Sequence, residues 1–347
     1  VAELIAAKRV VAARTVRLGG VAAAVSMMGF GNRIGFAFDA AITREQLFSP
    51  DHGSLVLELV AGENPATALA GIEYVLLGQT QAKPEIAVLG ATVSLAAAQQ
   101  AWDETLEKVF PTQTGQAAET AVFKPYPGPA TGGRAKTSVA KPRVIIPVFP
   151  GSNCEYDSAR AFAQAGGEPE VLVVRNLSAR DIEQSVDALA KAIRRCQILM
   201  LPGGFSAGDE PDGSGKFIAA LFHSPSLSEA VMQLLNERDG LVLGICNGFQ
   251  ALIKLGLLPY GQIRPLSEDS PTLTFNRIGR HISRMADTRV VSGLSPWLSL
   301  VKPGDIHSIP VSHGEGRLVA SHEHLQRMAV QGQIATQYVN ADGNPSM

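Results

Sequence analysis

The feature that most constrains the fold is a continuous apolar run, Val144 to Phe149 (VIIPVF), which opens a long alternation of strand-like and helix-like segments. A strand without polar residues is typical of a parallel sheet that helices cover on both faces. The pattern predicts strands over 144–149, 170–174, 197–201 and 241–245, and helices over 156–165, 181–194, 216–222, 227–238 and 249–255. We therefore expect an α/β domain with a doubly wound parallel sheet over 141–347.

The sequence before this domain divides into two further regions. Residues 1–115 mix helical and strand patterns, and we expect a smaller α+β domain there. Its predicted helices cover 3–17, 21–28, 64–69 and 95–108, and its predicted strands cover 33–38, 54–59 and 85–89. Residues 116–140 are rich in Pro, Gly and small polar residues, which predicts a linker between the two domains.

Composition excludes several classes of protein. The formal net charge of −2 carries no basic excess, so we expect no nucleic acid as a partner. No run of about 18 apolar residues is present, so we expect no membrane span. Three scattered cysteines without a CxxC pair predict neither a disulfide framework nor a metal site. A cytoplasmic protein with reduced thiols fits these observations.

Cys246 lies where the strand over 241–245 turns into a helix, in the sequence GICNGFQ. Glycines two residues before and two residues after it, Gly244 and Gly248, permit the sharp turn of a nucleophile elbow, with Cys in place of Ser. Such a turn exposes the side chain above the sheet, and the N-terminus of the following helix favours a negatively charged sulfur. The bland alternative is a buried cysteine at a strand end.

A second strand end, LPGGFS, supports this interpretation. Adjacent glycines at 203 and 204 let the backbone approach a ligand closely, and an N–H group there could face that of Asn247 as a pair of oxyanion donors. The other two cysteines lack the flanking glycines. We expect Cys154 to be structural or to line a loop, and Cys196 to serve packing.

A thiolate nucleophile needs a base, usually a histidine that a carboxylate orients. Spacing alone favours His313 with Glu315, in the segment VSHGEGR, and a polar surface loop is the alternative. The other histidines lie in segments with no fitting frame.

Five motifs lie along Lys141 to Met347: VFPGSNCEYD, LPGGFSAGDE, GICNGFQAL, LTFN and VSHGEGR. With them the segment resembles the class I glutaminase domain of phosphoribosylformylglycinamidine synthases, enzymes of purine biosynthesis with a flavodoxin-like α/β fold. The sequence GGFSAGDEPDGSGKFIA is similar to that of single-chain, clostridial-like members.

The resemblance implies a residue-by-residue assignment of the site. Cys246 would form a thioester with glutamine and release ammonia, and the N–H groups of Gly204 and Asn247 would stabilise the oxyanion. Gln250, Ser312, His313 and Gly314 would hold the glutamine. In the family the catalytic His-x-Glu motif comes later, so we expect it beyond Met347. His313 is then a substrate-loop residue rather than the base, and this chain alone should have very low glutaminase activity.

In residues 1–115, the segments Gly19 to Ala24 and Phe30 to Gly35 carry a second resemblance. They are similar to the C-terminal half of an aminoimidazole-ribotide-synthetase-like module. We thus expect the chain to be the C-terminal part of a longer enzyme. Its remaining synthetase part would bind ATP, Mg²⁺ and formylglycinamide ribonucleotide. Two alternatives stay open, another Cys–His hydrolase of this fold and a non-catalytic pseudo-glutaminase or interaction module.

Overall fold

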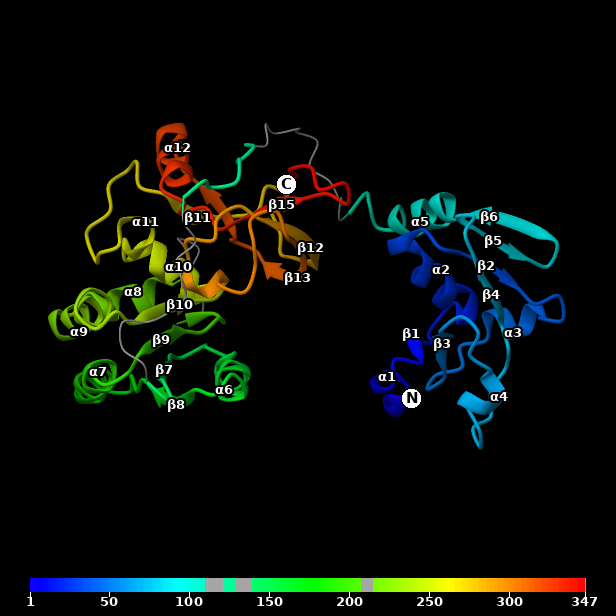
Figure 1. The fold of residues 1–347 in the computed structure, drawn as a ribbon, viewed down its shortest axis with the longest axis horizontal. Coiled ribbons are helices and arrows are strands. Elements are labelled where there is room, and N and C mark those ends of the chain that lie inside the picture. Colours follow the sequence, from blue (N-terminus) through cyan, green and yellow to red (C-terminus); the bar gives the residue numbers. More distant parts are fainter. Residues whose placement is uncertain (110, 112–120, 129–138, 207–214, 347) are drawn as a thin grey trace. The chain divides into compact units, whose positions relative to one another are not determined.

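The computed structural model describes residues 1–346 except 110, 112–120, 129–138 and 207–214 (Figure 1). The chain divides into two compact units, Val1–Thr114 and Gly115–Met347. The boundary expected at residue 115, most of the linker expected over 116–140, and Ala207 to Glu210 of the LPGGFSAGDE motif lie outside the described residues.

The N-terminal unit has two small sheets and a central helix. A β1–β3 antiparallel pair forms one sheet, and the other has the strand order β4-β2-β5-β6. The elements are α1 (Ala2–Ala6), β1 (Val10–Thr15), α2 (Gly20–Asn32), β2 (Gly35–Phe38), α3 (Arg44–Phe48), β3 (Leu55–Leu59), α4 (Pro65–Ala68), β4 (Gly78–Gln81), β5 (Glu85–Val88), β6 (Ala91–Ser94) and α5 (Leu95–Asp103).

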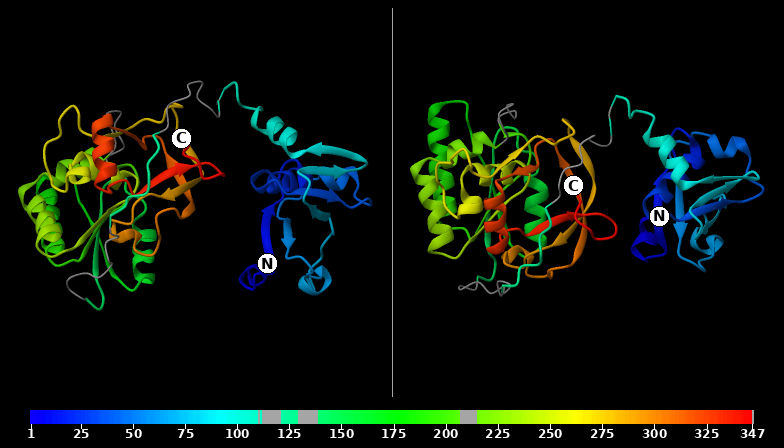
Figure 2. Two further views of the ribbon diagram at one scale, coloured as in Figure 1. Left: turned by 45° about the horizontal axis from the view of Figure 1, so that its top comes forward. Right: turned by 90° about the horizontal axis from the view of Figure 1, so that it is seen from above.

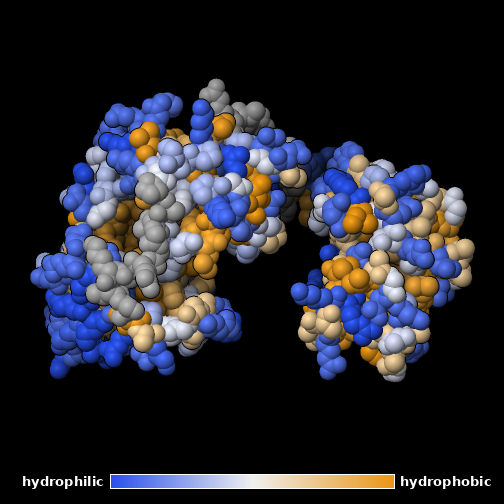
Figure 3. Space-filling view, viewed as in Figure 1, coloured by the Kyte–Doolittle hydropathy of each residue, from blue (hydrophilic) through white to orange (hydrophobic). Residues whose placement is uncertain are grey.

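Helix α2 supplies the core of this unit. Ala24 and Val25 on α2 pack against Val16 and Val56, with Phe36 and Phe38 at the edge of the cluster. Phe36 and Phe38 are two residues apart on one strand, so both rings lie on the same face, 4.8 Å apart between centroids. Apolar residues also reach the surface of this unit, as the orange patches of Figure 3 show.

The helix predicted over 3–17 is wrong. The helix ends at Ala6, and residues 10–15 form strand β1, which pairs with β3 from Val10–Leu59 to Thr15–Leu55. The β-branched pair Val10-Val11 favours a strand. Pairing with a partner at least 40 residues away decides the conformation, and the local pattern does not contain this information.

The C-terminal unit is built on a four-stranded parallel sheet of order β10-β9-β7-β8. The parallel α/β sheet expected for this unit is therefore present. Its first half comprises β7 (Arg143–Val148), α6 (Glu155–Gln164), β8 (Glu168–Val173), α7 (Ala179–Ile193), β9 (Ile198–Leu201), α8 (Lys216–Phe222), α9 (Pro225–Asn236), β10 (Leu241–Gly244), α10 (Asn247–Lys254) and α11 (Leu257–Tyr260).

Strand β7 is buried on both faces, as its apolar sequence predicts. Val144 and Ile146 pack with Met200 beneath α6. Ile145 faces the opposite way, into the larger cluster formed with α7, α8, α9 and α10. Figures 1 and 2 show α6 on one side of these strands and α7 and α9 on the other. Burying an aliphatic side chain stabilises a fold by about 1.5–3 kcal/mol. The helices packed on both faces therefore hold the strands of the parallel sheet, and the residues at their ends, in place.

A second, antiparallel part completes the C-terminal unit. A β11–β14 pair forms one sheet, and the other has the order β13-β12-β15. The elements are β11 (Thr272–Thr274), β12 (Ile282–Val290), the 3-10 helix η2 (Pro296–Leu298), β13 (Ile306–His313), β14 (Arg317–Val319), α12 (His322–Val330) and β15 (Thr336–Val339).

Residues 121–126 of the predicted linker lie against this antiparallel sheet. The Phe123 N–H donates to Gln337 Oε1 at 3.2 Å, and Gln337 Nε2 donates to the Ala121 carbonyl. The Tyr126 N–H donates to the Val291 carbonyl at 2.8 Å. This stretch is thereby bound to the C-terminal unit rather than free of both units.

Candidate active site

Cys246 lies in a strained turn between β10 and α10. It is the N-cap of α10, its φ is 52° and its ψ is −109°, and its side chain is exposed. A non-glycine residue rarely adopts a positive φ, and such strain is concentrated at functional sites. The sharp turn that the flanking glycines predicted is therefore present at this cysteine.

The two glycines beside Cys246 are required by close packing. A Cβ atom on Gly244 would lie 2.6 Å from the carbonyl oxygen of Gly248. A Cβ atom on Gly248 would lie 2.1 Å from the carbonyl oxygen of Leu201, at the end of the neighbouring strand β9. Helix α10 thus begins in direct contact with the strand that leads to Gly203 and Gly204.

Gly203 and Gly204 lie beside the cysteine at the end of β9. The position of a Cβ on Gly203 would be 3.3 Å from Cys246 Cβ. Gly204 has φ +119° and forms an isolated antiparallel bridge with Ser152. The bonds that flank this bridge are Phe205 N–H to the Gly151 carbonyl and Asn153 N–H to the Gly203 carbonyl.

This pattern leaves the backbone of Gly204 itself outside the ladder with residues 151–153. Its N–H has no acceptor among the residues that the structure describes. Asn247 is the first residue of α10, directly after Cys246. Backbone N–H groups at Gly204 and Asn247 can stabilise an oxyanion at Cys246.

A chain of buried hydrogen bonds joins the segments of the site. The Ser206 N–H donates to Asn247 Oδ1 at 3.4 Å, and Asn247 Nδ2 donates to Gln250 Oε1 at 3.3 Å. Gln250 Nε2 then donates to the Glu315 carbonyl at 3.0 Å. The side-chain amide of Gln250 therefore holds the 312–315 loop, which is the end of β13 with the turn that follows it, against α10.

Asn276, the last residue of the LTFN motif, fixes the same loop from the other side. Its Nδ2 donates to the carbonyls of His313 at 2.7 Å and Arg280 at 3.0 Å, and its N–H donates to the Gly314 carbonyl at 2.8 Å. Since the Asn276 amide nitrogen donates, its Oδ1 accepts from His313 Nδ1–H at 2.9 Å. The imidazole of His313 takes its orientation from Asn276 and not from Glu315.

The electrostatics of the loop favour a neutral imidazole. Burial, and then the neighbouring His281, lower the pKa of His313 below its usual range. His281 Nε2 lies 2.9 Å from Ser312 Oγ, and β12 pairs with β13 up to Ile282–His313. The sequence around His281 shows no catalytic pattern, because only the register of these two strands places His281 beside Ser312. Among the described residues, no hydrogen bond joins a histidine to Cys246.

Cys154 lies at the site rather than apart from it. It is the half-buried N-cap of α6, and its sulfur would be 3.5 Å from a Cβ placed on Gly203. Burial is the main cause that raises the pKa of the Cys154 thiol, followed by the nearby Cys246. Cys196 is buried in the main core, as expected for a packing residue, and burial raises its pKa to about 11.

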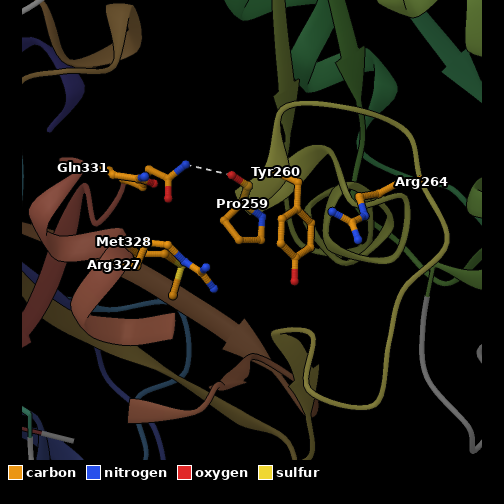
Figure 4. A pocket seen from close by; sticks show the side chains of 7 residues that line it. Pro259, Tyr260, Arg264, Arg327, Met328 and Gln331 are labelled. Carbon is orange, nitrogen blue, oxygen red and sulfur yellow. Dashed lines mark hydrogen bonds between the residues drawn. The ribbon is translucent and has the colours of Figure 1, made fainter. Parts of the chain in front are cut away.

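A cavity of about 360 Å³ lies elsewhere in this unit (Figure 4). Tyr260 and Arg264 stand side by side in it, with the guanidinium 4.6 Å from the ring centroid. The lining residues are Pro259, Tyr260, Arg264, Arg327, Met328, Gln331 and Gln333, and none of them is a predicted site residue.

The described part of the chain shows neither a cluster of metal ligands nor a membrane-spanning helix. It contains no group of three or more His, Cys, Asp or Glu side chains placed to hold a metal ion. No helix within it has both the length and the apolar character that crossing a membrane requires.

The parallel sheet and the strained turn at Cys246 define an α/β domain with a cysteine elbow, and comparison with known families narrows this class. Residues 141–347 match the CobB/CobQ-like glutamine amidotransferase domain, and the chain belongs to this family.

Individual relatives share one name, phosphoribosylformylglycinamidine synthase subunit PurQ. The protein from Treponema denticola is 34% identical over 217 residues, covering 60% of this chain and 75% of the relative. That from Aquifex aeolicus is 32% identical over 203 residues, covering 58% and 75%. A solved structure titled PurLQS from Thermotoga maritima is similar over 59% of this chain and 80% of that one, with 27% identity and a TM-score of 0.41.

Proposed function

We propose that residues 141–347 are the glutaminase part of a phosphoribosylformylglycinamidine synthase. The observation that carries the proposal is the strained backbone of Cys246 beside the Gly203–Gly204 strand end, in a chain of the amidotransferase family. The shared name of the relatives supports the choice of this synthase.

The reaction uses Cys246 as the nucleophile. Its sulfur attacks the carboxamide carbon of glutamine, and the N–H groups of Gly204 and Asn247 stabilise the negative oxygen of the tetrahedral intermediate. The C–N bond then breaks, the nitrogen takes up a proton and ammonia leaves. Water hydrolyses the remaining thioester to glutamate and frees the thiol.

The 312–315 loop binds the glutamine in this proposal. Ser312, His313 and Gly314 contact the substrate, and Gln250 keeps the loop in place through the Glu315 carbonyl. His313 is a binding residue, because its Nδ1 is bonded to Asn276 and no hydrogen bond to Cys246 is present among the described residues. The pair His313 and Glu315 is the alternative base.

The ammonia is consumed in the amidation of formylglycinamide ribonucleotide. That step takes place in a synthetase part, which uses ATP and Mg²⁺. We propose that the chain comes from the single-chain type of this enzyme. Two observations support this proposal. The sequence GGFSAGDEPDGSGKFIA is similar to that of single-chain members, and residues 1–115 resemble an aminoimidazole-ribotide-synthetase-like domain. We propose a cytoplasmic location for this purine-synthesis enzyme.

Covalent labelling tests the proposal without requiring turnover. The chain is treated with the glutamine analogue 6-diazo-5-oxo-norleucine, and the modified residue is mapped by peptide mass spectrometry. We expect label on Cys246, reduced in amount when glutamine is present in excess. The matched control is Cys196→Ser, which should label like the unaltered chain because Cys196 is buried away from the site.

Three results would count against parts of the assignment. Label absent from Cys246 in a folded chain would remove the amidotransferase function and leave a non-catalytic module. Label on Cys246 that glutamine does not diminish would favour another hydrolase of this fold. Robust glutamine turnover that His313→Ala abolishes would make His313 the base, contrary to the binding role.

A further inference from the structure

A second thiol stands next to the nucleophile. The same point in space, the position of a Cβ on Gly203, is 3.3 Å from Cys246 Cβ and 3.5 Å from Cys154 Sγ. Because Gly203 has no side chain, no Cβ occupies this point, which is in contact distance of both cysteines. Both cysteines are free thiols.

The two cysteines differ in the way that a reactive and a resolving thiol differ. Cys246 is exposed at the top of the elbow, whereas Cys154 is half-buried at the start of α6. The Cys154 thiol is held in place, with its S–H directed to Asn153 Oδ1 at 3.3 Å. An exposed nucleophilic cysteine with a second cysteine nearby is the arrangement found in redox-sensitive proteins.

We propose that Cys154 resolves an oxidised Cys246, so that peroxide converts the pair reversibly into a Cys154–Cys246 disulfide. This inference rests on the reactive Cys246 of the proposed function and adds a regulation of that site. The disulfide occupies the sulfur that would attack glutamine, and it spares Cys246 from irreversible oxidation.

The chemistry balances with hydrogen peroxide as the oxidant. The Cys246 thiolate attacks one peroxide oxygen, the O–O bond breaks and hydroxide leaves, which gives a sulfenic acid. The Cys154 sulfur releases its proton to the solvent and attacks the Cys246 sulfur. The S–S bond forms as the S–O bond breaks, and hydroxide leaves. In sum, two thiols are oxidised to a disulfide and one peroxide is reduced to two waters.

Further oxidation of the Cys246 sulfenic acid competes with disulfide formation, so the two products can be compared in a test. A second peroxide can oxidise the Cys246 sulfenic acid to a sulfinic acid, which thiols do not reverse. Because Cys154 is beside the sulfenic acid, resolution should outrun this second oxidation. The raised pKa of the Cys154 thiol, caused mainly by burial, means that resolution should speed up as the pH rises.

Peptide mapping of the chain after peroxide treatment tests the proposal. The reduced chain is exposed to hydrogen peroxide, quenched with N-ethylmaleimide and digested without reductant. We expect a linked peptide pair containing Cys154 and Cys246, which dithiothreitol separates. In Cys154→Ser the link should be absent and sulfinic acid at Cys246 should rise several-fold. Cys196→Ser, the matched control, should keep the link.

A variant of Gly203 tests the geometry in a second way. In Gly203→Ala the new methyl group would lie 3.3 Å from Cys246 Cβ and 3.5 Å from Cys154 Sγ, so it would contact both cysteines. We expect less linked peptide and more sulfinic acid in this variant. An unaltered chain that forms sulfinic acid at Cys246 without any linked peptide would overturn the proposal.

Labelling by 6-diazo-5-oxo-norleucine on the reduced chain separates the two failures. Label without a disulfide removes only the redox inference. A disulfide without label removes the amidotransferase function and leaves the thiol pair.

Discussion

His313 is the site residue for which the structure differs most from the role that spacing suggests. Its spacing from Glu315 suggested a catalytic base, but its Nδ1 is bonded to Asn276 in a half-buried loop. Burial and the neighbouring His281 lower its pKa, so the folded loop stabilises the neutral form. No sequence pattern could reveal this, because Asn276 and His313 meet only through tertiary structure.

The lowered pKa of His313 predicts a loss of stability in mild acid. In the unfolded chain the His313 imidazole has a pKa of about 6.5. Below this pH the unfolded state binds a proton that the folded state resists, so the free energy of unfolding decreases as the pH is lowered. Urea unfolding from about pH 7.5 to about pH 5.5 should show a smaller loss in His313→Gln than in the unaltered chain.

The exposed His307 on the same strand provides the matched control. His307→Gln should show the same acid-induced loss as the unaltered chain. If His313→Gln loses as much stability in acid as the unaltered chain and His307→Gln, protonation of His313 does not contribute to the acid-induced loss.

At the scale of elements, the parallel sheet and its helices follow from local pattern. Continuous apolar strands and amphipathic helices alternate, and the predicted helix over 216–222 has the same bounds as α8. The helix predicted over 3–17 failed because the pairing of β1 with β3 is long-range. The antiparallel strands that carry residues 312–315 were not predicted, because their pairing is likewise between separate segments of the chain.

The contact between α10 and β9 predicts a strong effect of one methyl group. Gly248→Ala would place a Cβ 2.1 Å from the Leu201 carbonyl oxygen, so either the helix or the strand must move. Overpacking of this kind costs about 1–3 kcal/mol. Urea unfolding should show this loss, and 6-diazo-5-oxo-norleucine should label Cys246 more slowly.

Gly314→Ala is the control for stability. A Cβ on Gly314 would meet no atom within 4 Å. The free energy of unfolding of this variant should therefore stay within about 0.5 kcal/mol of that of the unaltered chain. Equal stability of Gly248→Ala and Gly314→Ala would mean that the elbow tolerates a side chain at 248.

At the scale of the whole molecule, composition predicted a linker, but contacts bind part of it. Residues 121–126 are held on the C-terminal unit chiefly by the buried Gln337, through bonds to Ala121 and Phe123. Proline and glycine mark where regular structure stops, and they do not reveal which surface an extended segment contacts.

The role of Gln337 can be tested by limited proteolysis. Gln337→Ala removes the side-chain bonds to residues 121 and 123, each worth about 1 kcal/mol, so the segment should open more often. Chymotrypsin should then cleave after Phe123 several-fold faster than in the unaltered chain, as followed by mass spectrometry. Gln333→Ala, a glutamine bonded elsewhere to the Pro259 carbonyl, should leave the rate unchanged. Equal rates in both variants would show that Gln337 does not hold the segment.

The positive φ of Cys246 has a consequence for the evolution of such domains. Glycine adopts this backbone conformation at lower cost than any residue with a side chain, so the fold by itself gains nothing from a cysteine there. Selection for the thiol must therefore act continuously against the drift of this position toward glycine. In a lineage that has abandoned the chemistry, residue 246 should be among the first to change, while Gly244 and Gly248 persist because packing alone demands them.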